Sequence, residues 1–396
     1  MKPILKLVLF CAFIFLISTI TLFKKLDIKK QSRNVDLSKI SVTSSKYPST
    51  TTTRVQEEVK LNKELAVVVI ACRRVESLEI LLEAILKYRP SSDIPIFVSQ
   101  DCDVPEIPQL ISTKFQNDVK YIKHEKQGNT TGLKRKKSHQ YVYLSNHYKN
   151  ALQYFFDENQ FETVIIIEDD LMIAPDFFSY FLATKKLLLN DPTLLCVSAW
   201  NDNSMPDLID QNATSLLYRT DFFAGLGWML TKSLWTEIGH RWPNAYWDDW
   251  LREPQQRRNR QCVRPEIGRT SMQKYGRYGA SSGQFFDTHL KKIVHNEVPV
   301  DFEEQDLSYL EPKKYEELFR EEVSKSRLIE KMRNIENCNN HTSFKIAYTD
   351  LKKFVKTNRL KIMSDEKRGI HRSSYNGIIP IFHNNCRVFI VPKNLV

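Results

Sequence analysis

The stretch Val164–Asp170, V-I-I-I-E-D-D, joins four β-branched apolar residues directly to three consecutive carboxylates. A continuous Val/Ile run indicates a parallel strand covered on both faces, because strands with one solvated face alternate apolar and polar residues. The three acids would then lie at the carboxyl end of the strand, where ligands bind in open α/β sheets. Carboxylate oxygens in such a crevice suit Mg²⁺ or Mn²⁺. We therefore expect a site for a divalent metal and a phosphate group; an acidic turn in water is the alternative.

Strand and helix patterns alternate along the chain, which is typical of α/β architecture. They predict strands at 65–71, 94–99, 119–122, 163–167 and 194–199, and helices at 75–88, 139–156 and 177–189. The first two strands end in A-C-R-R and S-Q-D-C, so their polar residues would gather beside the acids, where a nucleotide could bind. The sequence lacks G-x-G-x-x-G and P-loop motifs, which disfavours a Rossmann dinucleotide site and a Walker ATPase.

A second acid pair lies in a tryptophan-rich region, 217–250, which contains five of the six Trp. In the motif W-D-D-W, Asp248 and Asp249 are flanked by Trp247 and Trp250. A carboxylate against aromatic walls is partly desolvated, which raises its pKa and suits it to general-base work. A purely structural corner is the alternative. Together the two acid sets suggest that one handles a metal-bound diphosphate while the other activates a nucleophile.

The amino terminus carries an uncharged apolar stretch of 17 residues, Leu7–Phe23, near the lower limit for a membrane-spanning helix. A cleaved signal peptide is the alternative, but no small-residue cleavage pattern follows the stretch. We predict a cytoplasmic tail at 1–6, an uncleaved signal anchor at 7–23 and a polar stem at 24–62. The flanking lysines and arginines leave the orientation of the anchor open.

The rest of the chain is predicted to form three parts. A nucleotide-sugar-binding catalytic domain is expected at 63–276, a loop or linker at 277–312 and a smaller domain at 313–396. The Gly- and Ser-rich segment 268–283 resembles a mobile loop or hinge. A charged helix is predicted from Pro312 to Asn334.

Charge and cysteine content bear on partners and compartment. The formal net charge of +11 permits a nucleic acid, a membrane surface or an anionic substrate, but no nucleic-acid-binding motif accompanies it. Six cysteines lie outside the apolar stretch, and an even number fits a disulfide framework in an oxidising compartment without fixing the pairing. Three N-x-[ST] sequons are compatible with a lumenal location. They begin at Asn129, Asn212 and Asn340.

Long strings in the sequence resemble the N-acetylglucosaminyltransferase I family. In order from about residue 65 to 295 they are I-A-C-R-R, Y-R-P-S, V-S-Q-D-C, E-D-D-L-M-I-A-P-D-F-F-S-Y-F, S-A-W-N-D-N, L-Y-R-T-D-F-F-A-G-L-G-W, Y-W-D-D-W, C-V-R-P-E and S-G-Q-F-F-D-T-H-L. The resemblance implies a type II Golgi membrane protein with a lumenal catalytic domain of the GT-A type, an α/β fold. It also implies Mn²⁺-dependent transfer of GlcNAc from UDP-GlcNAc to the α-1,3-linked mannose of a high-mannose N-glycan, forming a β-1,2 bond with inversion.

The resemblance assigns roles to residues at matching positions. Asp170 would be the metal ligand and Asp248 the catalytic base. Substrate contacts would come from Arg74, Asp101 and His147 at the uridine and phosphate, Glu168 and Asp169 at the ribose and GlcNAc, Trp247 beside the sugar, and Ser281 on a closing loop. The family's disulfides would join Cys72 to Cys102 and Cys196 to Cys262. Apart from the resemblance, Cys338 and Cys386 are candidates for a third bridge within the smaller domain.

The chain departs from the family pattern in two places. The family usually has C-D-R where this chain has Cys72, Arg73 and Arg74, and the loop before Ser281 is about two residues longer. Two other functions are alternatives to the one that the resemblance implies. A related β-1,2-GlcNAc transferase would act on O-linked mannose, but such proteins carry a longer stem with an extra carbohydrate-binding domain. A catalytically inactive, membrane-tethered lectin would have no need for both acid sets.

Overall fold

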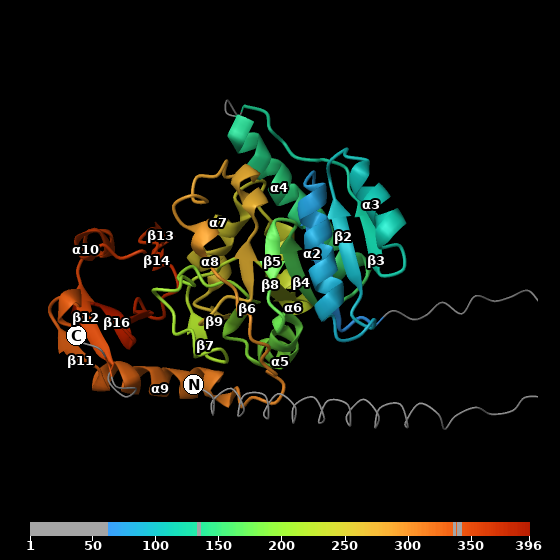
Figure 1. The fold of residues 1–396 in the computed structure, drawn as a ribbon. Coiled ribbons are helices and arrows are strands. Elements are labelled where there is room, and N and C mark those ends of the chain that lie inside the picture. Colours follow the sequence, from blue (N-terminus) through green and yellow to red (C-terminus); the bar gives the residue numbers. More distant parts are fainter. Residues whose placement is uncertain (1–61, 133–135, 336–337, 339–342) are drawn as a thin grey trace, which may run out of the picture. The chain divides into compact units, whose positions relative to one another are not determined.

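The computed structural model describes residues 62–132, 136–335, 338 and 343–396, which all belong to one compact unit of the chain (Figure 1). Residues 1–61 lie outside the described residues. They include the predicted tail, the predicted anchor and all but the last residue of the predicted stem. Within the described part, no helix combines the length and apolar character needed to cross a bilayer. The amino-terminal assignments therefore stay predictions.

An eight-stranded sheet forms the centre of the unit, in the order β3-β2-β1-β4-β8-β6-β9-β7. Its strands are β1 (Leu65–Ala71), β2 (Ile96–Gln100), β3 (Val119–Lys123), β4 (Thr163–Glu168), β6 (Leu194–Ser198), β7 (Leu217–Thr220), β8 (Trp228–Thr231) and β9 (Gln261–Pro265). The predicted buried strand is β4, whose apolar residues are all buried. It pairs in parallel with β1 but antiparallel with β8, so the sheet is mixed rather than wholly parallel.

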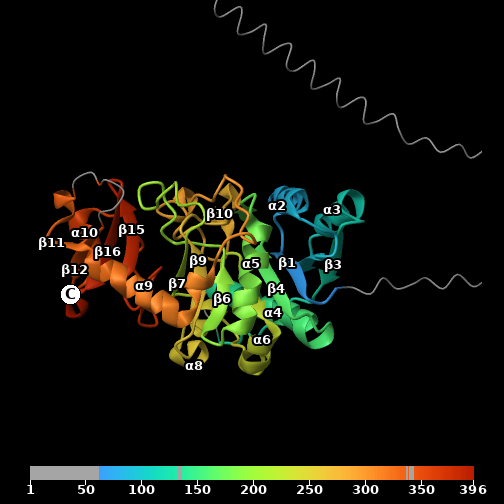
Figure 2. The same ribbon diagram turned by 90° about the horizontal axis from the view of Figure 1, so that it is seen from below.

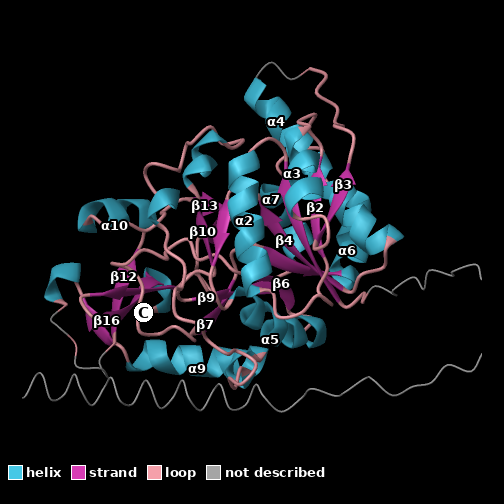
Figure 3. Ribbon diagram, turned by 45° about the vertical axis from the view of Figure 1, so that its right-hand side comes forward, coloured by secondary structure: helices cyan, strands magenta, loops and turns pink. Residues whose placement is uncertain are grey.

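Helices cover both faces of this sheet (Figure 3). One layer contains α2 (Val75–Tyr88), α3 (Glu106–Lys114) and α5 (Phe177–Asn190), and the other contains α4 (Lys136–Gln153), α6 (Lys232–Ile238) and α7 (Trp247–Leu251). Successive residues of β1 point to opposite layers: Val67 and Val69 belong to the first core cluster, Ala66 and Val68 to the second. Burial on both faces explains the uninterrupted apolar runs. The helix α4 continues as a π-helical turn at Tyr154–Glu158, and the short α8 (Pro254–Arg257) follows α7.

The acids at the end of β4 are followed at once by a short strand, β5 (Leu171–Ile173). It pairs antiparallel with β10 (Thr270–Met272), which lies inside the segment 268–283. The prediction that this whole segment is a loop is therefore wrong for its first residues, because they complete a ladder beside the acids. A 3₁₀ turn at Lys274–Tyr278 comes next, and further single turns are at Gly239–Arg241, Leu290–Lys292, Ser308–Leu310, Met332–Asn334 and Lys393–Leu395.

The carboxyl-terminal part builds a second sheet in the order β11-β12-β16-β15. Its elements are α9 (Pro312–Lys325), β11 (Arg327–Ile329), β12 (Phe344–Tyr348), α10 (Leu351–Asn358), the hairpin β13 (Glu366–Lys367) and β14 (Ile370–His371), β15 (Ile379–His383) and β16 (Cys386–Pro392). Figure 2 shows α9 extending from β7 toward this sheet, and Phe319 packs edge-on against Phe389. The helix predicted to reach Asn334 ends at Lys325, because the chain then becomes edge strand β11.

Candidate active site

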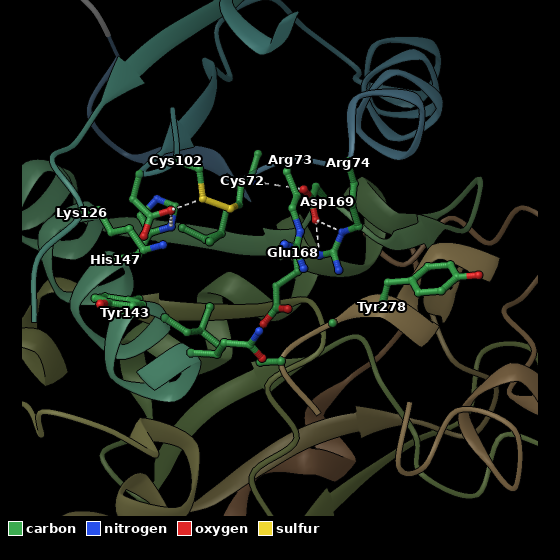
Figure 4. A pocket seen from close by; sticks show the side chains of 17 residues that line it. Cys72, Arg73, Arg74, Cys102, Lys126, Tyr143, His147, Glu168, Asp169 and Tyr278 are labelled. Carbon is green, nitrogen blue, oxygen red and sulfur yellow. Dashed lines mark hydrogen bonds and ion pairs between the residues drawn. A yellow bond between two sulfur atoms is a disulfide. The ribbon is translucent and has the colours of Figure 1, made fainter. Parts of the chain in front are cut away.

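Polar residues from the carboxyl ends of β1, β2 and β4 line a cavity of about 200 Å³ (Figure 4). We call it the first cavity. The α4 helix and the loop after residue 277 complete its walls. It brings together five of the predicted substrate-binding residues, namely Arg74, Asp101, His147, Glu168 and Asp169. Parallel strands that end at one edge explain why residues about 100 positions apart meet here.

In the acid cluster at the end of β4, Asp169 and Asp170 are buried and are held by Arg74, and Glu168 is half-buried. The Arg74 Nε donates to Asp169 Oδ1 at 2.8 Å, and its Nη1 lies 3.0 Å from Asp170 Oδ2. The backbone N–H of Cys72 also donates to Asp169, at 3.3 Å. Burial raises the pKa of Glu168 to about 7 and that of Asp169 to about 6, while the Arg74 charge opposes both shifts. The positive charge of the Arg74 guanidinium offsets the repulsion between these adjacent carboxylates.

Two residues that the sequence analysis missed brace the backbone of the acid cluster. The Ser77 hydroxyl donates to the carbonyl of Asp169 at 2.7 Å. The side-chain amide of Gln273 donates to the carbonyls of Ser77 and Leu171, and its own N–H donates to the carbonyl of Asp170. Ser77 lies on α2 and Gln273 follows β10, so the turn is fixed from two sides. No local sequence signal marks a contact between residues 196 positions apart.

The far wall of the first cavity contains Asp101 and His147. The His147 ring is buried, with Nδ1 at 3.4 Å from Asp101 and Nε2 at 2.9 Å from the Ser99 hydroxyl. Burial lowers the pKa of His147 to about 3, so the imidazole is neutral near pH 7. A disulfide joins Cys72 to Cys102, and it ties the end of β1 to the end of β2 beside Asp101. With both sulfurs in a disulfide, these cysteines offer no thiolate to a metal.

A second cavity, of about 360 Å³, adjoins the first, and Leu144, Glu168, Gly279 and Ala280 line both. Four further predicted residues line this second cavity, namely Asp170, Trp247, Asp248 and Ser281. The loop over both cavities passes close to the acids, because a Cβ at Gly276 would overlap the Met272 side chain and lie 3.5 Å from Asp170 Oδ2. Nine catalytic, metal-binding and substrate-binding residues were predicted. Four of them line only the first cavity, four line only the second, and Glu168 lines both.

Asp248 is half-buried and is held by an arginine. Its side chain is 41% exposed, and its Oδ2 lies 2.8 Å from Arg252 Nη1, which also contacts Asp249 at 2.8 Å. The ion pair spans one turn of helix, so Arg252 orients both carboxylates. Trp247 is buried and stacks on Trp228 and Trp242. Its main contribution is to anchor α7, from which Asp248 reaches the cavity.

Tyr148 connects the two acid sets. The Tyr148 hydroxyl donates to Glu168 Oε1 at 2.8 Å, while its ring stacks on Trp247 with centroids 4.3 Å apart. Tyr148 lies on α4 and is 1% exposed. The position of α7 is therefore coupled through two aromatic rings to the orientation of Glu168.

The carboxyl-terminal part supplies residues to the second cavity that the sequence analysis did not predict. Met363, Lys367 and Arg372 line it together with Asp202. The Arg372 guanidinium donates to Asp202 at 2.8 Å and to both oxygens of Asp365. Nothing near Arg372 in the sequence signals that it meets a residue 170 positions earlier.

The residues present fit a divalent cation at Asp170. Its Oδ1 is buried and has no hydrogen-bond partner among the described residues, whereas Oδ2 faces Arg74. A buried carboxylate oxygen without a partner is rare in proteins, and an oxygen donor of this kind suits Mg²⁺ or Mn²⁺. The structure also contains disulfides Cys196–Cys262 and Cys338–Cys386.

Comparison with known proteins assigns the chain to a family. The sequence profile described as the GNT-I family matches residues 15–396. An Alpha-1,3-mannosyl-glycoprotein 2-beta-N-acetylglucosaminyltransferase from Arabidopsis thaliana is 37% identical over 351 residues, which span 84% of this chain and 74% of that protein. The chain belongs to the GNT-I family. The resemblance given by the long sequence strings is thereby confirmed.

Two solved structures share less sequence with this GNT-I family chain. A crystal structure of S. aureus TarS residues 1–349 has a TM-score of 0.38 and 12% identity, with 54% of this chain and 62% of that chain covered. A mannosyltransferase, PcManGT from Pyrobaculum calidifontis in complex with GDP-Man and Mn2+, has a TM-score of 0.34 and 16% identity, with 52% and 57% covered. These scores are too low to transfer a fold type or a ligand to this chain.

Proposed function

We propose that this chain is an inverting N-acetylglucosaminyltransferase of the GT-A type. It transfers GlcNAc from UDP-GlcNAc in β-1,2 linkage to the α-1,3-linked mannose of high-mannose N-glycans, the step that opens hybrid and complex glycan formation. Membership of the GNT-I family supports this activity. The observation that carries the proposal is the pair of adjoining cavities. Glu168 and Asp169 line the first, and Glu168, Asp170 and Asp248 line the second.

The first cavity is proposed to bind the nucleotide diphosphate. Arg74 and Lys126 supply positive charge to it, and Asp101 and Glu168 supply acceptors for hydroxyl groups. Asp170 would hold Mn²⁺, which when bound neutralises the charge that develops on the departing diphosphate. Arg74 orients Asp169, and its positive charge opposes the rise in the pKa of this carboxyl that burial causes.

The second cavity is proposed to bind the acceptor mannose. A sugar hydroxyl is a weak nucleophile, so a carboxylate has to take its proton as the bond to the anomeric carbon forms. Asp248 is exposed to the cavity and is fixed by Arg252, which suits it to this task. Inversion requires one displacement with the acceptor opposite the departing UDP, and therefore no covalent enzyme intermediate.

We also propose that the protein is a single-pass type II membrane protein of the Golgi with its catalytic part in the lumen. Three disulfides within the described residues support an oxidising compartment. The apolar stretch 7–23 would be the anchor and 24–62 the stem. Imaging a tagged full-length chain against Golgi markers tests the location, and protease protection of the carboxyl terminus tests the orientation.

The decisive test of activity is incubation of the full-length chain with UDP-GlcNAc, Mn²⁺ and a panel of mannose acceptors, followed by linkage analysis. We expect β-1,2-linked GlcNAc on the α-1,3-mannose of a high-mannose N-glycan. Omission of Mn²⁺, or its replacement by chelator, should remove the product. Transfer to O-mannosyl peptide alone would favour the rival enzyme, and mannose binding without transfer would favour the lectin.

A further inference from the structure

The loop that joins β6 to β7 carries one of the three N-x-[ST] sequons of the chain. Its residues are Asn212, Ala213 and Thr214. This motif accepts N-linked glycans on surface loops of secreted proteins. The triplet also arises often by chance in sequences, so the surroundings of the asparagine have to decide whether a glycan fits there.

The backbone around this sequon is held in place at two points. Before it, Leu208 is 3% exposed, and its carbonyl accepts a hydrogen bond from the N–H of Phe382 on β15 at 2.8 Å. At its last residue, the carbonyl of Thr214 accepts a hydrogen bond from the buried Arg269 guanidinium. The sequon therefore lies on a defined surface turn between two anchored points.

Asn212 is exposed on this turn, and its side chain takes no part in holding the fold. Its backbone N–H donates to Asp210 Oδ1 at 3.0 Å, and the N–H of Ala213 donates to the Asp210 carbonyl at 3.1 Å, which closes the turn. The Asn212 side-chain amide makes no hydrogen bond with any other described residue. A glycan on Nδ2 would therefore displace no hydrogen bond of the fold.

Asn212 is also separate from the proposed transfer machinery. None of residues 203–223, all of which the structure describes, lines the first or the second cavity. A bulky hydrophilic group on Asn212 would therefore be attached away from the residues that are proposed to bind donor and acceptor.

The sequon at Asn129 lies in a different environment. Lys126 in the same loop lines the first cavity. The Asn129 carbonyl accepts a hydrogen bond from the Asn244 side-chain amide at 3.0 Å, and Tyr246, two residues after Asn244, lines the second cavity. A glycan on Asn129 would be attached beside both cavities, where it would compete with substrates for space. Asn212 is therefore the better suited of these two asparagines.

We propose that Asn212 carries an N-linked glycan. In the transfer step, Nδ2 forms a bond to the anomeric carbon of an oligosaccharide, while the bond from that carbon to a lipid diphosphate breaks. Nδ2 loses one proton, and the lipid diphosphate leaves with the electron pair of the broken bond. This modification takes place in the lumen of the secretory pathway, so the proposal rests on the proposed lumenal location and not on the transfer activity.

The test is the gel mobility of the denatured full-length chain, produced in eukaryotic cells, before and after digestion with peptide N-glycosidase. Asn212→Gln and Thr214→Ala both destroy the sequon, so each should run faster than the wild type by one glycan. Thr214→Ser is the matched control, because serine preserves the sequon, and it should run as the wild type does. After digestion all four proteins should run alike. Since the gel separates denatured protein, a variant that folds poorly still gives a result.

The outcomes separate this site from the proposed activity and location. Faster migration of both Asn212→Gln and Thr214→Ala, with Thr214→Ser unchanged, supports the site even if the wild type transfers no GlcNAc. Wild-type mobility of the first two variants before digestion overturns the site, even if transfer is normal. Protease protection of the carboxyl terminus measures the location separately, so a protected chain without a glycan on Asn212 overturns the site alone.

Discussion

The two acid sets differ in how they are buried, although each is paired with one arginine. In the first set the side chains of Asp169 and Asp170 are 1% and 6% exposed, and Arg74 holds both. In the second set Asp248 is 41% exposed, and the buried partner is Arg252. Carboxylates that are shielded from water need a positive charge held close to them. This environment suits a site that binds a metal cation and a diphosphate. An exposed carboxylate on a buried arginine keeps one side open for an incoming hydroxyl group.

The largest effect should come from removing the exposed carboxylate. Asp248→Asn is expected to lower turnover by about 10³-fold, because the amide cannot accept the acceptor's proton. The affinity for UDP-GlcNAc should stay within about twofold, since donor binding lies in the other cavity. Single-turnover kinetics with donor titration measures both quantities.

Asp249→Asn is the matched control for this change. Asp249 contacts the same Arg252 nitrogen at the same distance of 2.8 Å, so both variants disturb that ion pair equally. We expect Asp249→Asn to lose at most about tenfold in turnover. Equal losses in the two variants would contradict a special role for Asp248.

The next largest effect should come from the buried set. Asp170→Asn is expected to lower the affinity for Mn²⁺ by about 100-fold or more. The reason is that even the loss of a residue that only hydrogen-bonds to a metal ligand lowers metal affinity by about 10–100-fold. Donor binding should lose its dependence on Mn²⁺ in the same variant. The control is Asp103→Asn, near the same sheet edge, where the side chain is 96% exposed. This variant should bind Mn²⁺ with the affinity of the wild type. An unchanged Mn²⁺ titration in Asp170→Asn would remove this residue as ligand.

Buried His147 should make stability fall as the pH falls. Its folded pKa is about 3 and an unfolded histidine titrates near 6.5, so the unfolded chain binds more protons between these values. The stabilising contribution is complete above about pH 6.5 and is lost at about 1.4 kcal/mol per pH unit below it. Glu168, with a raised pKa of about 7, acts in the opposite direction.

The His147 contribution is isolated by comparing urea unfolding of the wild type and His147→Gln at pH 7 and pH 5.5. The free energy of unfolding should decline less steeply in the variant. His240→Gln, at an exposed histidine, should leave the slope as in the wild type. Identical slopes in all three proteins would contradict the neutral, buried state of His147.

The smallest effect should come from the residue that links the two sets. Tyr148→Phe removes the hydroxyl that donates to Glu168 but retains the ring that stacks on Trp247. One neutral donor to a half-buried carboxylate contributes about 1 kcal/mol, so its loss should weaken UDP-GlcNAc binding roughly fivefold. Calorimetric titration against Tyr88→Phe as control measures the difference. A wild-type affinity in Tyr148→Phe would show that Glu168 is positioned without it.

The sequence predicted the buried acid set better than the exposed one. The uninterrupted apolar run of β4 identified both the strand and the edge at which its acids lie, because burial on both faces leaves a local signature. The ion pair of Asp248 was missed, although its partner Arg252 lies at i+4, directly after the short α7, and gave a local signal. For Gln273 and Arg372 no local signal exists, since their partners lie 102 and 170 positions away. The end of α9 was also misjudged, because its charged pattern continues into an exposed edge strand.

A structure of the full-length chain with UDP, Mn²⁺ and a mannose acceptor would test the central assignment most directly. We predict UDP in the first cavity with the metal at Asp170, and an Asp248 oxygen within about 3.2 Å of the attacking 2-hydroxyl group. UDP bound against Asp248, or an Asp248 carboxylate that remains turned away from the acceptor hydroxyl, would contradict the assignment of the two acid sets.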